Sequence, residues 1–499
     1  MCALRAHNAV KEILVPAKTG FTVLSENTAL HSRYDPAQEA EKYISSLSLK
    51  AHKYFILIEP GLDYLAAALK KKFPLSSVIS LHCSSFFPCG GTNKNIPAES
   101  EFNWNPSLPQ SLEDFLESHL ADAGAENIKL IDWKPSVNIY GNACLELVSR
   151  TVECIRIISA GRKTVRNFGK RWFKNALHNL ALLQNPVFAI PGTAPVLVCA
   201  SGPGLEGSLQ EIAEWEKKPF RPFIIAVSSA APALLCRGIK PDLIITTDGG
   251  SWAYFHITES IRECEKISAE KPVIASSLTA ELPSQTKNYR NLVLRDGSLW
   301  QDILLKSAGI LTASLAFPQR GTVSISALDL AFYLTKGNVY ICGMDFAHSD
   351  LLTHARPYAF DKLAEQRQNR EEPYYSLLFE RENMIQNSGS LSVYSSWFLS
   401  NLSLFSDRLF SYGKSIQGIK PGNPMPDERE EFPPFTKIYA NPKTSVKSSI
   451  AVLQNALNNP LFAKQLCTEL GELLLPDIRA ESAVLADEIK KTLPEFSRG

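Results

Sequence analysis

The chain lacks the features that mark several large classes of protein. No stretch reaches about 18 uninterrupted apolar residues, and residues 1–20 hold no apolar segment of signal-peptide length, so we expect neither a membrane span nor secretion. Lysine and arginine number 52 against 51 acidic residues, so no overall field would draw the protein to nucleic acid or to an anionic membrane. We expect a cytoplasmic protein that meets any charged partner through a local site.

Motifs of metal and nucleophile chemistry are also missing. The ten cysteines form no CxxC pair and show no recurrent spacing, which predicts reduced thiols in the core. The patterns HExxH, HxxxH, GxSxG and Walker A are absent. Their absence argues against a dedicated zinc site, a serine hydrolase and a P-loop kinase.

What is present indicates an α/β protein of several domains, since 499 residues are too many for one core. Two apolar runs flank a helical pattern within residues 53–84, which predicts a β-α-β unit in a smaller N-terminal α/β, Rossmann-like domain, residues 1–150. The loop after the first run has one glycine, Gly61, and not the GxGxxG set, so we favour a structural role over nucleotide binding. A basic helical segment, residues 151–190, then bridges to the next domain.

Residues 191–368 alternate strand and helix patterns and predict a central catalytic domain with a doubly wound, Rossmann-like sheet. Its short continuous apolar runs are typical of parallel strands that are covered on both faces. Residues 369–499 carry mostly helical spacing and form the predicted C-terminal helical region, with a loop of five prolines at residues 418–434. The strands predicted in the central domain are residues 196–200, 223–227, 243–247, 273–276, 292–295 and 339–342.

Glycines and small polar residues follow several of these strands or begin the helices between them. Because the carboxyl ends of parallel strands lie along one edge of a sheet, these loops should converge on one site. Backbone amides beside glycines and at a helix start suit an anion such as phosphate, although the serine pair and Thr322 also suit ordinary helix capping. The residues expected to bind a phosphorylated donor are Ser201, Gly202, Pro203, Gly204, Ser228, Ser229, Gly321, Thr322 and Gly343.

Three side chains in these loops are candidates for a general base. Asp345 and Asp248 each follow a predicted strand, and His354 lies shortly after Asp345. A carboxylate or an imidazole within hydrogen-bond reach of a hydroxyl can take its proton during attack. His348 is a weaker candidate of the same kind. Asp248 also suits a plain turn, a contact to a ribose diol or a metal ligand.

Taken together, these motifs resemble those of the motility-associated factor (Maf) glycosyltransferases, and the resemblance spans most of the chain. The sharpest match is RGIKPD followed by a strand and Asp248, and the next is GMDFA with the downstream pair His354-Ala355. The matching segments are LHSRYDPAQEAEKYI (30–44), SGPGLEGSL (201–209), SSAAPALLCRGIKPDLIITTDGG (228–250), GTVSISALDLAFYL (321–334) and VYICGMDFAHSDLLTHA (339–355).

The resemblance implies a bacterial enzyme that transfers a nonulosonic acid, such as pseudaminic or legionaminic acid, from its CMP-activated form to serine or threonine of flagellin. It implies a nucleotide-sugar donor, flagellin as the protein partner, no required cofactor or metal, and a central domain similar to bacterial sialyltransferases. Attack from the face opposite the departing CMP would invert the anomeric centre. By position, the residues that match the family's motifs are Gly202, Pro203, Gly204 and Leu205, Ser228 and Ser229, Asp242 and Asp248, and Gly343 and Asp345.

The chain departs from the family's pattern at two positions, and two other functions stay open. Gly204 stands where the family usually has serine, and Ser228 where it commonly has asparagine, so two side-chain donors are lost. The central motif is also similar to archaeal 6-hydroxymethylpterin diphosphokinases, which transfer pyrophosphate from ATP with magnesium and would use Asp248 and Asp345 near the metal. The third alternative is a non-catalytic flagellin-binding scaffold. The glycosyltransferase is favoured, since a pterin kinase would not need the outer domains.

Overall fold

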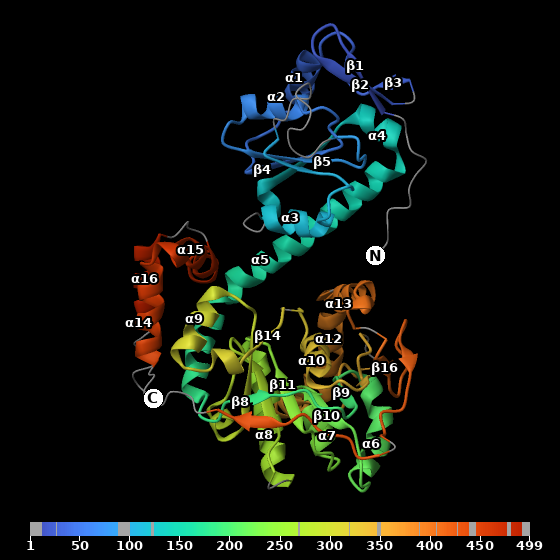
Figure 1. The fold of residues 1–499 in the computed structure, drawn as a ribbon. Coiled ribbons are helices and arrows are strands. Elements are labelled where there is room, and N and C mark those ends of the chain that lie inside the picture. The colour runs from blue at the N-terminus through green and yellow to red at the C-terminus, as the bar shows by residue number, and fades with distance from the viewer. Residues whose placement is uncertain are drawn as a thin grey trace. The chain divides into compact units, whose positions relative to one another are not determined.

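The computed structural model describes residues 12–25, 27–87, 100–120, 124–267, 270–318, 320–346, 351–388, 390–405, 407–426, 428–438, 446–476 and 481–491. The chain divides into two compact units, Met1–Val165 and Arg166–Gly499. The boundary falls inside one long helix, α5 (Asn142–Leu182), drawn in teal in Figure 1. The basic helical segment predicted before the central domain is part of this helix. Each unit has its own parallel sheet.

The first unit is built on a four-stranded parallel sheet in the order β6-β5-β4-β7. Apolar side chains of α1 and α2 pack on one face of this sheet, and those of α3 and the first turns of α5 pack on the other. The predicted β-α-β unit is confirmed as β4, α2 and β5. The elements are β1 (Glu12–Pro16), β2 (Phe21–Ser25), β3 (Thr28–Ala29), α1 (Pro36–Ser46), β4 (Tyr54–Ile58), α2 (Tyr64–Lys72), β5 (Ser77–Leu81), β6 (Phe102–Trp104), α3 (Leu112–Leu120), β7 (Ile128–Asp132) and α4 (Lys134–Tyr140).

Strand order in this sheet reverses at β4. The chain adds β5 and then β6 on one side of β4, and it later places β7 on the other side. The loops after β4, β5 and β7 therefore flank a switch point at the carboxyl edge, where open α/β sheets commonly bind ligands.

The second unit contains a nine-stranded sheet in the order β14-β13-β12-β11-β10-β9-β15-β16-β17, with every neighbouring pair parallel. The α/β class and the doubly wound sheet are confirmed, and the six predicted strands correspond to β9 to β13 and β15. The helices and strands of the second unit from β8 to β15 are β8 (Val187–Ala189), β9 (Val196–Cys199), α6 (Leu209–Trp215), β10 (Phe223–Val227), α7 (Ala231–Leu235), β11 (Leu243–Thr246), α8 (Ser251–Ile267), β12 (Val273–Ser277), β13 (Asn291–Arg295), α9 (Leu299–Ser307), β14 (Leu315–Ala316), α10 (Val323–Leu334) and β15 (Val339–Cys342).

Helix α10 is the central helix of this unit. It packs across β9, β10, β11 and β15, and its small buried residues Ala327 and Ala331 allow close approach to the sheet. The chain passes directly from α10 into β15, which runs parallel to the other strands. The first turn of α10 therefore lies at the carboxyl edge of the sheet, beside the loops predicted to form the site.

The sequence predicted no strand after residue 369, and the structure corrects this. Strand β16 extends the sheet beside β15, and β17 lies beyond it. Strands of three and two residues are too short to show a hydrophobic period. The remaining elements are α11 (Ala359–Arg367), α12 (Tyr374–Ser388), α13 (Ser390–Ser400), β16 (Leu409–Ser411), β17 (Lys420–Pro421), β18 (Phe435–Lys437), α14 (Val446–Leu457), α15 (Pro460–Leu474) and α16 (Ser482–Lys491).

The last part of the chain is helical, as predicted. Helix α14 packs along α9, and α15 and α16 pack against α14 (Figure 1). The proline-rich segment before these helices ends in β18, which pairs antiparallel with β8. None of the described helices is long and apolar enough to cross a membrane.

Candidate functional site

The loops after β9, β10, β11 and β15 lie along one edge of the central sheet. Strand order reverses at β9, which has β10 on one side and β15 on the other, so the switch point lies between β9 and β15. Direct contacts join the loops there. The amide of Gly202 donates to the carbonyl oxygen of Gly343 at 2.7 Å, and the amide of Ala355 donates to that of Ser201 at 2.8 Å.

The Gly202-Pro203-Gly204 loop fits around the carboxylate of Asp345. The amide of Gly204 donates to Asp345 Oδ2 at 2.5 Å, and the aspartate side chain is only 3% exposed. A Cβ on Gly202 would lie 2.5 Å from the Gly343 oxygen, and one on Gly204 would lie 2.4 Å from Asp345 Oδ1. The glycine at 204, where the family pattern has serine, thus leaves the room that the carboxylate occupies.

Lys414 brings a positive charge to this loop. It follows β16, and its Nζ lies 3.7 Å from Asp345 Oδ1, with more than half of its side chain exposed. Sequence reasoning missed Lys414 because a three-residue strand gives no pattern that would place it at this edge. An anion that approaches the glycine loop meets this ammonium group together with the buried carboxylate.

The first turn of α10 contributes further donors at the same edge. The first amides of any α-helix have no partner within the helix, and they attract anions. Thr322 precedes this turn with an extended backbone, and in the described part of the chain its hydroxyl caps no amide of α10. Gly321 has φ +73°, and a Cβ there would lie 3.2 Å from Cε1 of Tyr394 in α13.

Asp248 is exposed at the end of β11. Its Oδ1 accepts a hydrogen bond from the amide of Gly250 at 2.7 Å, and its carbonyl oxygen accepts one from the amide of Glu281 at 3.0 Å. Burial and then the charge of Asp248 raise the pKa of Tyr394, which indicates that the two side chains are near each other. Of the three candidate bases, Asp248 is the most accessible to a substrate.

Two asparagines of α5 hold the loops after β11 and β12. Asn175 Nδ2 donates to the carbonyl oxygens of Gly249 at 3.2 Å and Thr279 at 3.0 Å. Asn179 Nδ2 donates to those of Leu278 and Ala280, each at 2.8 Å. Sequence reasoning missed both residues, and the available signal was their spacing of one helical turn on a segment that was assigned only as a bridge.

His354 lies against an aromatic ring. Its imidazole stacks on Tyr358, with centroids 4.0 Å apart, and its Nδ1 lies 3.0 Å from Thr353 Oγ1. Burial, with smaller contributions from His256 and Arg381, lowers the pKa of His354 to about 3. The ring is therefore neutral near pH 7 and a poor proton acceptor. His348 lies outside the described residues.

The serine pair after β10 occupies two environments. Ser228 is buried, its amide donates to the Ile245 oxygen at 2.9 Å, and its carbonyl oxygen accepts from Ser260 Oγ at 3.0 Å. Ser229 is half-buried. Both residues lie at the carboxyl edge, but the contacts of Ser228 hold β10 to β11 and α8.

Two residues of the RGIKPD motif, Arg237 and Asp242, make contacts that hold segments of the fold together. Asp242 precedes β11 and lies at the opposite edge of the sheet, where it accepts two hydrogen bonds from Arg221 at 2.6 and 2.9 Å and one from the Ile224 amide at 2.8 Å. Arg237 donates to Glu206 Oε2 at 2.9 Å and to the carbonyl oxygen of Arg356 at 2.7 Å. Arg237 thus fixes the helical turn after the glycine loop to the segment that carries His354.

No described residues form a group of three or more His, Cys, Asp or Glu side chains that could hold a metal ion.

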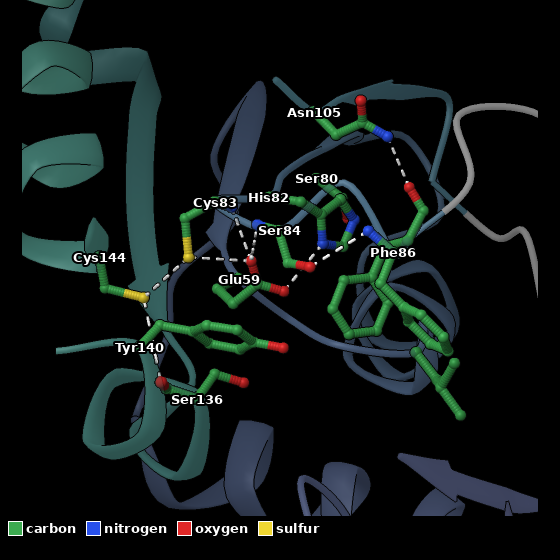
Figure 2. A network of polar contacts seen from close by, with 12 residues as sticks. Glu59, Ser80, His82, Cys83, Ser84, Phe86, Asn105, Ser136, Tyr140 and Cys144 are labelled. Atoms are coloured by element: carbon green, nitrogen blue, oxygen red, sulfur yellow. Dashed lines mark hydrogen bonds and ion pairs between the residues drawn. The ribbon is translucent and has the colours of Figure 1, made fainter. Parts of the chain in front are cut away.

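The carboxyl edge of the first unit's sheet holds a buried polar network (Figure 2). Glu59 follows β4 with φ +44° and is fully buried. Its Oε1 lies 3.0 Å from His82 Nδ1, and its Oε2 accepts from the amide of Cys83 at 2.6 Å and from the Cys83 thiol at 3.1 Å. The loop that begins at Glu59 is therefore tied to the loop after β5.

Comparison with known proteins gives a family match for the central segment. Residues 170–351 match the model of a family described as 6-hydroxymethylpterin diphosphokinase MptE-like. This range includes the candidate residues up to Asp345 but not His354. Two uncharacterized proteins of Treponema pallidum (strain Nichols) are also similar, one 29% identical over 61% of this chain and the other 24% identical over 69%. The chain spans 64% and 60% of the length of these two relatives.

Among solved structures, the chain is similar to the MAf glycosyltransferase from Magnetospirillum magneticum AMB-1. The TM-score is 0.54, with 12% sequence identity, over 99% of this chain and 86% of the other. At this identity the likeness concerns the fold, and it extends over both units. The resemblance predicted from the sequence motifs is confirmed at that level: the chain has the fold of the Maf glycosyltransferase, with a central segment similar to the MptE-like family.

Proposed function

We propose that this protein is a glycosyltransferase that moves a nonulosonic acid from a CMP-activated donor to serine or threonine of flagellin, with inversion. The observation that carries the proposal is that Asp345 contacts both the Gly204 amide and Lys414 at the switch point of a sheet that shares the Maf fold, with the first turn of α10 at the same edge of that sheet. Amides and an ammonium group at one edge of the sheet suit a phosphate that gains charge as it departs. The acceptor and the sugar come from the resemblance alone.

The donor site is assigned as follows. The phosphate of CMP binds at the amides of the glycine loop and of the first turn of α10, with Lys414 as the counter-charge. Asp345 already accepts the Gly204 amide, so it must turn away or share that amide when a phosphate arrives. Its proposed role is to keep the loop in shape and to position Lys414, since a buried carboxylate with these partners has little access to a substrate.

The general base is assigned to Asp248. An acceptor hydroxyl is a poor nucleophile and needs a base within hydrogen-bond reach as the new bond forms. Asp248 is exposed at the same edge and has one oxygen, Oδ2, that does not bind the Gly250 amide. The low pKa of His354 and the burial of Asp345 favour Asp248 over both.

A second candidate function is pyrophosphate transfer from ATP with magnesium. The match of residues 170–351 to the MptE-like family favours it. In that reaction Asp248 and Asp345 would approach the metal, and the glycine loop would bind the nucleotide phosphates.

Ligand binding separates the two functions. A ligand that binds only the folded state raises the melting temperature. We expect CMP to raise it for the glycosyltransferase, and ATP with magnesium but not CMP to raise it for the kinase. If neither ligand changes the melting temperature, the chain is not an enzyme of either class and the scaffold alternative is favoured.

The decisive experiment is the intact mass of flagellin produced with the full chain and the CMP-sugar pathway enzymes. The expected result is a mass gain of one or more sugar units that disappears with Asp248→Asn and persists with Asp302→Asn, a control at an aspartate of α9 that pairs with Arg295 of β13. An unchanged flagellin mass in the presence of the intact protein and donor would contradict the proposal.

A further inference from the structure

Two cysteines of the first unit contact each other near the carboxyl edge of its sheet. Cys83 Sγ, in the loop after β5, lies 3.5 Å from Cys144 Sγ in the first turn of α5 (Figure 2). Cys83 is half-buried and Cys144 is fully buried. These residues are 61 positions apart, so only the fold brings them together. The contact is close to van der Waals distance, and a bond length of about 2.05 Å needs a shift of about 1.5 Å.

The thiol of Cys83 also contacts a buried base. Its Sγ donates to Glu59 Oε2 at 3.1 Å, and the same oxygen accepts the Cys83 amide. Glu59 lies on one side of the Cys83 sulfur and Cys144 on the other (Figure 2). The side chains thus provide a proton acceptor and a second sulfur for one thiol.

We propose that Cys83 and Cys144 form a reversible redox site that takes hydrogen peroxide or an organic hydroperoxide as its oxidant and closes to a disulfide. This site is independent of the proposed transferase activity, because it uses only residues of the first unit. Neither the MptE-like match nor the glycine loop has any part in it.

The reaction balances in two steps. The Cys83 sulfur attacks one peroxide oxygen, the O–O bond breaks, and the thiol proton passes to Glu59 and on to the leaving oxygen. A sulfenic acid forms, together with water from hydrogen peroxide or an alcohol from an organic hydroperoxide. The Cys144 sulfur then attacks Cys83 Sγ, the S–O bond breaks, and the Cys144 proton leaves with the hydroxide as water. Two thiols are oxidised by two electrons, and one peroxide is reduced.

Glu59 determines the speed of the first step. Cys144, burial and the Glu59 charge all raise the pKa of Cys83, so few free thiolates exist near pH 7. Transfer of the proton to Glu59 during attack avoids a free thiolate. The site should therefore react slowly with iodoacetamide and comparatively fast with peroxide.

The test treats the folded full chain with hydrogen peroxide and maps its peptides by mass spectrometry. We expect a Cys83–Cys144 cross-link with the loss of two hydrogens, reversal by dithiothreitol, and a melting temperature several degrees higher for the oxidised first unit. Cys83→Ser and Cys144→Ser should each abolish the cross-link, whereas Cys236→Ser, at an exposed cysteine of the second unit, should leave it unchanged.

Glu59→Gln sharpens the test, because it keeps the shape of the side chain and removes the base. We expect cross-linking on the order of 100-fold slower in this variant, with circular dichroism confirming that it is folded. If Glu59→Gln unfolds, the rate in the intact protein against pH decides: assistance by Glu59 predicts a rate nearly independent of pH between 6 and 8, and attack by a free thiolate predicts a tenfold rise per unit. Oxidation of Cys83 to the sulfinic acid without a cross-link, or cross-links to Cys236 in equal amount, would overturn the proposal.

Discussion

The carboxyl edges of the two sheets have the same topology and opposite contents. In each sheet the strand order reverses beside one central strand, β4 or β9, and a carboxylate at that edge accepts a backbone amide from a neighbouring loop. The bond joins the loops after β4 and β5 in the first sheet and the loops after β15 and β9 in the second. In the first unit this carboxylate is Glu59, and its two oxygens form hydrogen bonds with His82, Cys83 and Ser84. In the second unit it is Asp345, which faces a loop of glycines and an exposed lysine.

The comparison indicates that topology brings loops together at an edge, whereas the residues in those loops determine the space and charge that are left for a ligand. Around Glu59 the hydrogen-bond donors of the loop already bind the carboxylate, which stabilises the first unit. The Cys83 thiol is the reactive group that remains. Around Asp345 the glycines remove side chains, and the helix start and Lys414 add positive charge. Substitutions at the two edges should therefore differ in whether they change stability or activity.

The largest effect is expected from filling the glycine loop. In Gly202→Ala the new methyl would meet the Gly343 oxygen and Asp345 Oδ2 at 2.5 Å, so the loop must move. Displacement of positioning groups by about 1 Å costs on the order of 100-fold in rate. We expect the rate of sugar transfer to fall by about that factor, measured by flagellin mass against time, and the melting temperature to fall as well.

Gly207→Ala is the matched control for this prediction, since Gly207 lies in the helical turn Pro203–Ser208, which begins within the loop, and its Cβ would meet no atom within 4 Å. It should keep full activity. A Gly202→Ala protein as active as Gly207→Ala would show that the glycine loop does not position the donor.

The next effect comes from neutralising the two carboxylates. In Glu59→Gln the side-chain amide nitrogen replaces either the oxygen that accepts the Cys83 amide or the oxygen that faces His82. A buried donor without an acceptor costs about 1–3 kcal/mol of unfolding free energy. Asp345→Asn keeps an oxygen for the Gly204 amide but loses the attraction to Lys414.

We expect Glu59→Gln to speed hydrogen exchange in peptides of residues 54–81 without lowering the transfer rate. Asp345→Asn should lower the transfer rate about tenfold, in line with a change of about 1.4 kcal/mol, with little change in exchange. The reverse outcome would mean that the first unit holds the catalytic edge.

Much of this architecture is predictable from the sequence, because buried parallel strands such as β10 and β15 are continuous apolar runs and the loops after them carry glycines and carboxylates. Lys414 and the contacts of Glu59 are not predictable, since they depend on strands and turns that come together only in the folded chain. The family's motif matches both Asp242 and Asp248, and only the structure shows that they lie at opposite ends of β11.

A smaller effect separates the two asparagines of α5. Asn175 holds Gly249, which is next to Asp248, whereas Asn179 holds only the loop after β12. Each alanine variant leaves two buried carbonyl groups without their donor and should lose about 1–3 kcal/mol in urea unfolding. Only Asn175→Ala should also lower kcat several-fold. Equal kcat values in the two variants would show that Asp248 takes no part in the reaction.

The smallest effect is in the pH dependence of stability, which should be alike in the two units. Burial lowers the pKa of His31 in the first unit and of His354 in the second to about 3, so both are neutral when folded and take a proton near pH 6.5 when unfolded. Their contribution to stability is complete above pH 6.5 and is lost as the pH falls from there towards 3.

His354→Phe keeps a ring to stack on Tyr358 and should flatten the fall of the urea midpoint between pH 7 and pH 4. His31→Phe should flatten it too, but from a lower midpoint at pH 7, because His31 Nε2 accepts the buried amide of Leu62 at 2.9 Å. The two histidines therefore have similarly lowered pKa values but different contacts. His31 accepts a hydrogen bond within the fold, whereas His354 stacks on a ring beside the candidate site. An unchanged slope in His354→Phe would show that folding does not lower the pKa of this ring, and His354 would then again be a candidate for acid-base catalysis at the edge of the second sheet.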